Sequence, residues 1–187
     1  RVGDMFALPF GDDHFDVATS FNGIWQGCEE ALREARRVVR PGGLAAITVP
    51  SFLPERVCWA LSTEYHEVPG GHVRIYTRVE LQAKLARAGL NALWHHHAHG
   101  LHSPYWWLKC AVGVHNDKHR LTSAYHRLLV WDIMRKPAVT RLAEQALNPL
   151  IGKSLVVYAV KAPGRTDGGG AADYRGSAGA GRRIGDR

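Results

Sequence analysis

Residues 29–49 decide the fold, and they read EEALREARRVVRPGGLAAITV. Apolar side chains recur at helical spacing from Ala31 to Val39, which predicts a helix over residues 29–40. The Pro41-Gly42-Gly43 run ends that helix. Residues 44–49 form a nearly continuous apolar run, which predicts a strand covered on both faces.

Strand and helix patterns alternate on both sides of this stretch. A β-prone run covers residues 15–21, and a capping box formed by Thr77 and Glu80 predicts the start of a helix. Further strands are expected over residues 90–94 and 154–161, with a mainly helical insertion at about residues 100–152 between them. This order predicts an α/β domain with a largely parallel sheet over residues 1–163. Residues 164–187 are Gly-rich with one aromatic residue, so we expect a flexible tail there.

Composition excludes several classes of protein. The 187 residues are 45% apolar and 22% charged, as in a soluble globular protein. No run approaches the roughly 20 apolar residues of a membrane span, so we expect no integral membrane segment. Three Cys without a Cys-x-x-Cys pair argue against a disulfide scaffold or a thiolate zinc site, and they favour a cytoplasmic location.

The formal charge of +7 belongs to the second half of the chain. Residues 1–99 carry 10 Lys or Arg against 11 Asp or Glu, whereas residues 100–163 carry nine against three. A basic insertion suits a phosphate, a nucleic acid or an anionic membrane surface, and it is also compatible with an ordinary solvated face.

The first 49 residues contain a set of motifs in a fixed order. These are Gly3-Asp4-Met5, Leu8-Pro9-Phe10, Phe15-Asp16-Val17 and the run from Arg37 to Gly43. Together they resemble the class I S-adenosylmethionine-dependent methyltransferases of the type 11 group. A second match begins at His72 and continues through Thr77 to Leu90. The resemblance implies a partial Rossmann-like sheet made of the rear strands, with the last strand antiparallel, and S-adenosylmethionine as the cofactor.

The resemblance also implies a set of cofactor contacts. Asp4, Met5 and Phe6 follow a strand end where the family recognises adenine, and a carboxylate, a thioether and a ring suit that purine. Phe21 and Asn22 end the next strand, where the family meets the methionine part of the cofactor. Core packing for Phe21 and a turn for Asp4 are the alternative roles.

Two departures from the family pattern bear on activity. The stretch after residue 21 lacks the His that many members carry there. The first strand and the Gly-x-Gly-x-Gly cofactor loop of the family do not precede Gly3. We therefore expect an amino-terminally truncated enzyme that by itself binds the cofactor weakly and is inactive. The alternative is a non-catalytic fragment or pseudoenzyme that acts as an interaction module with an exposed strand edge.

Histidines are the candidate catalytic groups. Five of the eleven His lie within residues 95–102, at the end of an expected parallel strand. In an extended segment His95, His97 and His99 share one face. These histidines are compatible with structural roles, with action on the acceptor or with metal binding. We predict that His97 and His99, together with His72, are candidate catalytic bases. We assign no metal.

The expected acceptor is a small molecule, a sugar or a glycolipid that is methylated on a hydroxyl group. The aromatic run at residues 105–107 suits a sugar face or an acyl chain, and it suits core packing equally well. We expect the insertion to act as a lid that selects the acceptor. Nucleic acid is not expected, because Ser20-Phe21-Asn22-Gly23 lacks the Asn-Pro-Pro-aromatic signature of enzymes that methylate base amino groups. A nicotinamide dehydrogenase is not expected either, because no dinucleotide fingerprint is present. The oligomeric state stays undetermined.

Overall fold

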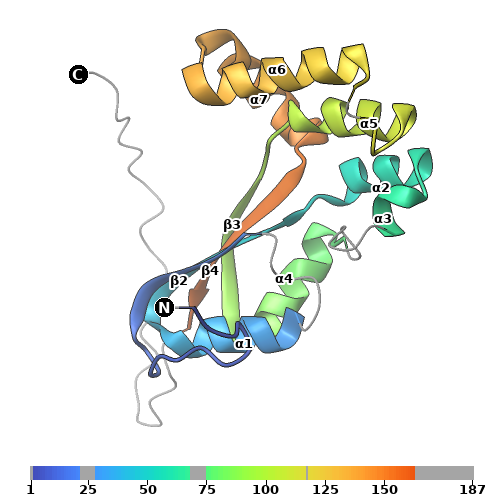
Figure 1. Cartoon of the computed structure of the whole chain (residues 1–187). Coiled ribbons are helices and arrows are strands. Elements are labelled where there is room, and N and C mark those ends of the chain that lie inside the picture. Colours follow the sequence, from blue (N-terminus) through green and yellow to red (C-terminus); the bar gives the residue numbers. More distant parts are fainter. Residues whose placement is uncertain (1, 22–27, 68–74, 117, 163–187) are drawn as a thin grey trace, which may run out of the picture.

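A four-stranded mixed sheet forms the centre of the computed structural model, which describes residues 2–21, 28–67, 75–116 and 118–162 (Figure 1). Its strands are β1 (Phe15–Phe21), β2 (Val39–Pro50), β3 (Leu90–Ala98) and β4 (Ser154–Lys161), in the order β1-β2-β4-β3. Strands β1 and β2 are parallel, and β4 is antiparallel to both of its neighbours. The predicted α/β class with an antiparallel last strand is therefore confirmed.

Helix α1 (Cys28–Val38) connects β1 to β2 and ends two residues earlier than predicted. Glutamates in its first turn and arginines in its last turn complement the helix dipole. Pro41 disfavours helical backbone at Arg40, and β2 consequently starts at Val39 and runs through the proline and both glycines. The Pro-Gly-Gly run is thus part of the strand rather than a loop between the two elements.

Helix α4 (Arg78–Arg87) begins with the predicted capping box. The Thr77 side chain accepts from the Glu80 backbone N–H at 3.2 Å, and the Glu80 carboxylate accepts from the Thr77 N–H at 2.8 Å. Two further helices, α2 (Phe52–Leu61) and α3 (Glu64–Glu67), lie between β2 and α4 in the chain.

The main core lies between one face of the sheet and the helices α1 and α4. Buried leucines of both helices pack with alternate residues of the strands, and the centre of this cluster consists of Leu32, Ile47, Leu81, Leu85 and Val157. This core holds β2 and β4 in place, so the carboxyl ends of β2 and β3 have a fixed position.

The insertion between β3 and β4 is helical, as predicted. It contains α5 (His102–Val112), α6 (Arg120–Arg135) and α7 (Ala138–Ile151). Figure 1 shows these helices beyond the end of the sheet at which β3 finishes, while α1 lies toward the opposite end. Of the helices that the structure describes, none is long and apolar enough to cross a membrane.

Candidate functional site

The segment before β1 makes a tight turn around Asp4. Its carboxylate Oδ1 accepts from the Phe6 N–H at 2.9 Å, and the Ala7 N–H donates to the Asp4 carbonyl at 3.1 Å. One carboxylate oxygen of Asp4 is therefore engaged within its own turn. Met5 and Phe6 are exposed on this turn, at 42% and 44%.

A pocket of about 290 Å³ separates this turn from the end of β1. Met5 and Phe21, which were predicted to contact the cofactor, both line it, together with small side chains of β1 and α1. Asp4 and Phe6 do not belong to the lining, and Asn22 lies outside the described residues. A thioether, an aromatic ring and an apolar floor at Ile47 fit one flat ring of a cofactor such as adenine.

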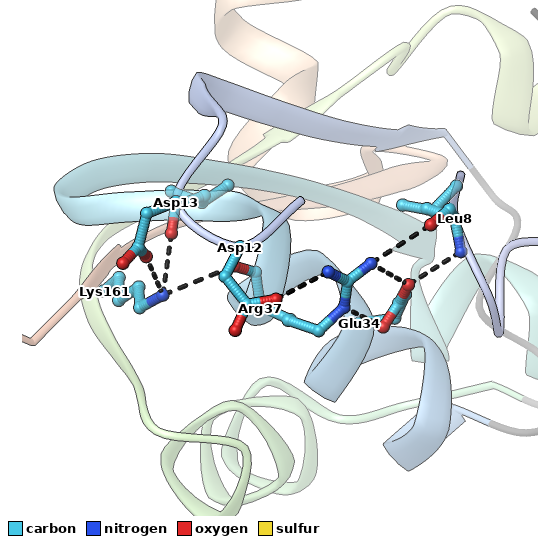
Figure 2. A network of polar contacts seen from close by, with 7 residues as sticks. Leu8, Asp12, Asp13, Glu34, Arg37 and Lys161 are labelled. Carbon is cyan, nitrogen blue, oxygen red and sulfur yellow. Dashed lines mark hydrogen bonds and ion pairs between the residues drawn. The ribbon is translucent and has the colours of Figure 1, made fainter. Parts of the chain in front are cut away.

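A polar network holds the turn against α1 (Figure 2). The Arg37 guanidinium donates to both carboxylate oxygens of Glu34, at 2.8 Å and 2.7 Å, and to the Leu8 carbonyl at 3.1 Å. Glu34 in turn accepts from the Leu8 N–H at 2.7 Å. Arg37 also pairs with Asp12 at 2.7 Å. The hydrogen bond from Arg37 lowers the pKa of Glu34, which keeps this carboxylate ionised.

The ammonium group of Lys161, at the end of β4, extends this network. It contacts the Asp13 carboxylate and donates to the Val39 carbonyl at 2.9 Å. The motif residues of the first 43 positions thus attach the turn to α1 and to the sheet. Their role in the structure is to position the pocket.

The histidine cluster lies partly inside β3 rather than after it. The strand continues to Ala98, four residues further than predicted, because each residue from His95 to Ala98 pairs with β4. His95 lies 3.1 Å from an Arg78 nitrogen, and His96 belongs to a group of stacked rings with Trp94 and Tyr158. His95 and His96 are therefore occupied by structural contacts.

His97 lines a second cavity, of about 200 Å³, at the carboxyl ends of β2 and β3. Ser51, Tyr76 and Gly152 also line this cavity. The Ser51 hydroxyl is buried without a hydrogen-bond partner among the described residues. Burial, and secondarily the charge of His95, lowers the pKa of His97, so its imidazole is neutral at neutral pH. A neutral imidazole beside an unsatisfied hydroxyl is able to accept a proton from a ligand.

His99 does not continue the face of His95 and His97. The strand has ended, and His99 adopts a left-handed backbone with φ 63°. Its Nδ1 lies 3.3 Å from the Ser154 hydroxyl, at the start of β4. The expectation of one shared face for His95, His97 and His99 is therefore wrong at its last member, because alternation holds only within the strand.

The remaining histidine predictions concern His72 and a metal. His72 lies outside the described residues. Within the ranges that the structure describes, no three His, Cys, Asp or Glu side chains are arranged so that they could hold a metal ion.

Sequence reasoning missed a buried polar cluster beside the second cavity. Lys153, just before β4, forms an ion pair with the fully buried Glu55 of α2 and donates to the Tyr65 hydroxyl at 3.1 Å. Its ammonium group also lies 3.7 Å from the Cys58 sulfur. The Lys153 carbonyl accepts from the Ser51 N–H at 2.9 Å, so the cluster is attached to the cavity wall.

The environment of this cluster shifts the pKa values of its titrating groups in opposite directions. A hydrogen bond from Cys110 and the nearby Lys153 charge lower the pKa of Cys58, whereas burial raises the pKa of Tyr65. The only sequence signal was a lysine placed directly before an apolar strand. Its partners lie about 90 to 100 positions away and follow no motif.

The aromatic run of α5 is used for packing. Trp107 donates from its indole N–H to the Pro54 carbonyl at 3.0 Å, and the Trp106 ring lies 5.5 Å from the Lys153 ammonium. Tyr105 lies against Tyr125 and His126 of α6. Of the two roles predicted for this run, the structure favours core packing over an open platform for a sugar.

Comparison with known proteins finds a sequence match in the amino-terminal quarter of the chain. Residues 1–47 match a family described as "Methyltransferase domain". The UbiE ubiquinone/menaquinone biosynthesis C-methyltransferase of Dinoroseobacter shibae is 49% identical over 55 residues, which are 28% of this chain and 22% of that protein. The mitochondrial 2-methoxy-6-polyprenyl-1,4-benzoquinol methylase of Xenopus laevis is 56% identical over 44 residues, 22% of this chain and 14% of that protein. The chain thus spans about a fifth or less of these relatives.

Solved structures extend the similarity of fold to the remainder of the chain. A Haloferax volcanii methyltransferase in complex with its Trm112 activator matches with a TM-score of 0.52 and 18% identity, over 87% of this chain and 61% of that one. A putative methyltransferase of Bacillus halodurans matches with a TM-score of 0.50 and 18% identity, over 86% and 70%. The resemblance to methyltransferases is thus confirmed by sequence in residues 1–47, and most of the chain shares the fold of these two solved structures.

Proposed function

We propose that this protein is an S-adenosylmethionine-dependent methyltransferase and that this chain contributes residues to both the cofactor site and the acceptor site. The observation that carries this proposal is the position of the pocket between Met5 and Phe21. It is built from residues 1–47, the segment that matches methyltransferase domains. When bound, the cofactor supplies an electrophilic methyl group.

The chain's own residues have separate tasks in this proposal. Met5 and Phe21 contact the cofactor, while Glu34 and Arg37 hold the turn that carries Met5. His97, neutral at neutral pH, accepts the proton of an acceptor hydroxyl that enters the cavity beside Ser51. Beyond this proton transfer, most of the rate acceleration of methyl transfer comes from orienting the acceptor oxygen or carbon toward the methyl group.

The acceptor is a small molecule that carries a hydroxyl group. The prediction from the sequence was O-methylation of a small molecule, a sugar or a glycolipid. The name of the Dinoroseobacter relative describes C-methylation in ubiquinone and menaquinone biosynthesis, and that of the Xenopus relative describes methylation of a benzoquinol. The family match covers residues 1–47 and not the helical insertion. A base at His97 serves either reaction, because a quinol also becomes more nucleophilic at carbon when its hydroxyl loses a proton.

Cofactor binding is tested by NMR titration of the ¹⁵N-labelled chain with S-adenosylhomocysteine at millimolar concentrations. We expect shifts in the amides around Met5 and Phe21, and loss of these shifts in Phe21→Ala. An equal titration of Leu93→Ala, an exposed apolar side chain on β3, is the control. Absence of localised shifts at saturating concentrations would overturn the proposal.

Acceptor chemistry is tested with the chain joined to a Gly-x-Gly-x-Gly cofactor segment, a methyl-labelled cofactor and two acceptors, a hydroquinone and a glycoside. A labelled C-methyl product favours the quinol and a labelled O-methyl product favours the sugar. His97→Gln should lower turnover at least tenfold while leaving the cofactor-induced shifts unchanged. Unchanged turnover in His97→Gln would exclude this residue as the base.

A further inference from the structure

Helix α6 presents a basic and apolar face away from the rest of the insertion. Arg120, Arg127 and Trp131 are separated by seven and four residues and therefore lie on one side of the helix. Thr122 and Leu129 on the other side are buried. Figure 1 places α6 at the extremity of the molecule, at the far end from α1.

The charges on this outward face have one sign. Arg120, Arg127 and Arg135 are all exposed, and none forms an ion pair with another described residue. The one acidic residue of α6, Asp132, lies close enough to His102 to act on the pKa of that residue, and it forms no ion pair with these arginines. Hence no carboxylate of α6 neutralises the three arginines.

Large apolar side chains lie between and beside these arginines. Trp131 is 44% exposed, Leu121 63% and Met134 75%. Several large apolar side chains on one solvent-exposed helix face are unusual, because their exposure costs free energy unless a partner covers them. The mixture of arginine, tryptophan and aliphatic residues is typical of helices that lie in a membrane interface.

The combination of charge and apolarity distinguishes between partners. A nucleic acid would pair with the arginines but leave Leu121 and Met134 in water. A second copy of the same face would bring arginines against arginines. An anionic bilayer satisfies both features, because its headgroups pair with the cations and its acyl boundary accepts the apolar groups.

We propose that the outward face of α6, formed by Arg120, Leu121, Arg127, Trp131, Met134 and Arg135, docks on an anionic lipid surface. Lipid phosphates pair with the arginines, and the Trp131 ring enters the boundary between headgroups and acyl chains. The surface is independent of the proposed methyl transfer, and its test does not require the cofactor.

Sedimentation with phospholipid vesicles tests the docking. The chain should bind vesicles with 30% phosphatidylglycerol and not pure phosphatidylcholine, and binding should weaken as salt increases. Arg127→Gln should lower the affinity about fivefold. Arg33→Gln is the matched control, since it removes one exposed arginine from α1 and should leave the affinity unchanged.

The apolar part of the surface is tested by Met134→Ser and by fluorescence. Met134→Ser should weaken vesicle binding severalfold, whereas Leu93→Ser on β3 should not. The difference spectrum between the unaltered chain and Trp131→Phe should shift to shorter wavelength on binding.

Three outcomes would overturn the proposal. The first is equal binding to neutral and anionic vesicles. The second is a loss of vesicle affinity in Arg33→Gln that equals the loss in Arg127→Gln. The third is a concentration-dependent dimer that Arg127→Gln disrupts, which would assign the surface to a second copy. Far-ultraviolet circular dichroism checks that each variant is folded, as expected for exposed positions.

Discussion

At the scale of single residues, Lys153 and Glu55 carry the largest expected effect on stability. Both are buried and paired, so replacing one leaves an isolated charge in the interior. Lys153→Met should lower the free energy of unfolding by about 3–5 kcal/mol, measured by urea denaturation. Lys118→Met, at an exposed position, should change it little. A Lys153→Met protein as stable as the parent would show that Glu55 does not depend on this lysine.

Two partly buried histidines, His97 in β3 and His102 at the start of α5, make stability depend on pH. Burial lowers the pKa of His97 and of His102 below the ordinary 6.5. Below pH 6.5 the unfolded chain therefore binds more protons than the folded one, and the free energy of unfolding falls as pH falls. We expect a lower melting temperature at pH 5 than at pH 7, and a smaller difference in His102→Gln. NMR titration of the His102 ring should give a pKa below 6.5; a higher value would contradict this explanation.

At the scale of elements, the contact between α1 and the turn before β1 determines the shape of the pocket. Arg37→Met removes the hydrogen bonds to Glu34, Asp12 and Leu8 that hold the turn. Amide exchange at residues 2–14 should become at least tenfold faster, and stability should fall by roughly 1–2 kcal/mol, because Arg37 is partly exposed. Arg33→Met on the same helix is the control. Unchanged exchange would mean that packing alone holds the turn.

At the scale of the whole molecule, β1 ends the sheet within the described residues. Its hydrogen bonds go to β2, and Val17 and Phe21 are exposed along it. An exposed edge strand pairs readily with other strands, so we expect the chain to self-associate at high concentration. Val17→Lys should reduce this association in analytical ultracentrifugation, while Val79→Lys, at an exposed position of α4, should not. Equal self-association of the two variants would mean that the chains do not associate through the β1 edge.

Much of this arrangement follows from local sequence patterns. The helix before Pro41, the capping box at Thr77 and the strand over residues 154–161 were predicted from periodicity and turn chemistry. The resemblance predicted five cofactor contacts near the first pocket; Met5 and Phe21 line it, Asp4 and Phe6 do not, and cofactor binding by these residues stays a prediction. These features depend on neighbours within a few positions, and a single sequence displays them.

Other features were decided by tertiary structure alone. The length of β3, and with it the separation of His99 from His97, depends on pairing with β4 more than 50 residues later. The burial of Lys153 with Glu55, and the packing of Trp106 and Trp107, likewise depend on contacts between distant segments. The sequence by itself determined the order of the elements and the methyltransferase motifs, because periodicity and turn chemistry act locally. Only the folded chain decided which histidine faces a cavity, because burial is a property of contacts that no local pattern encodes.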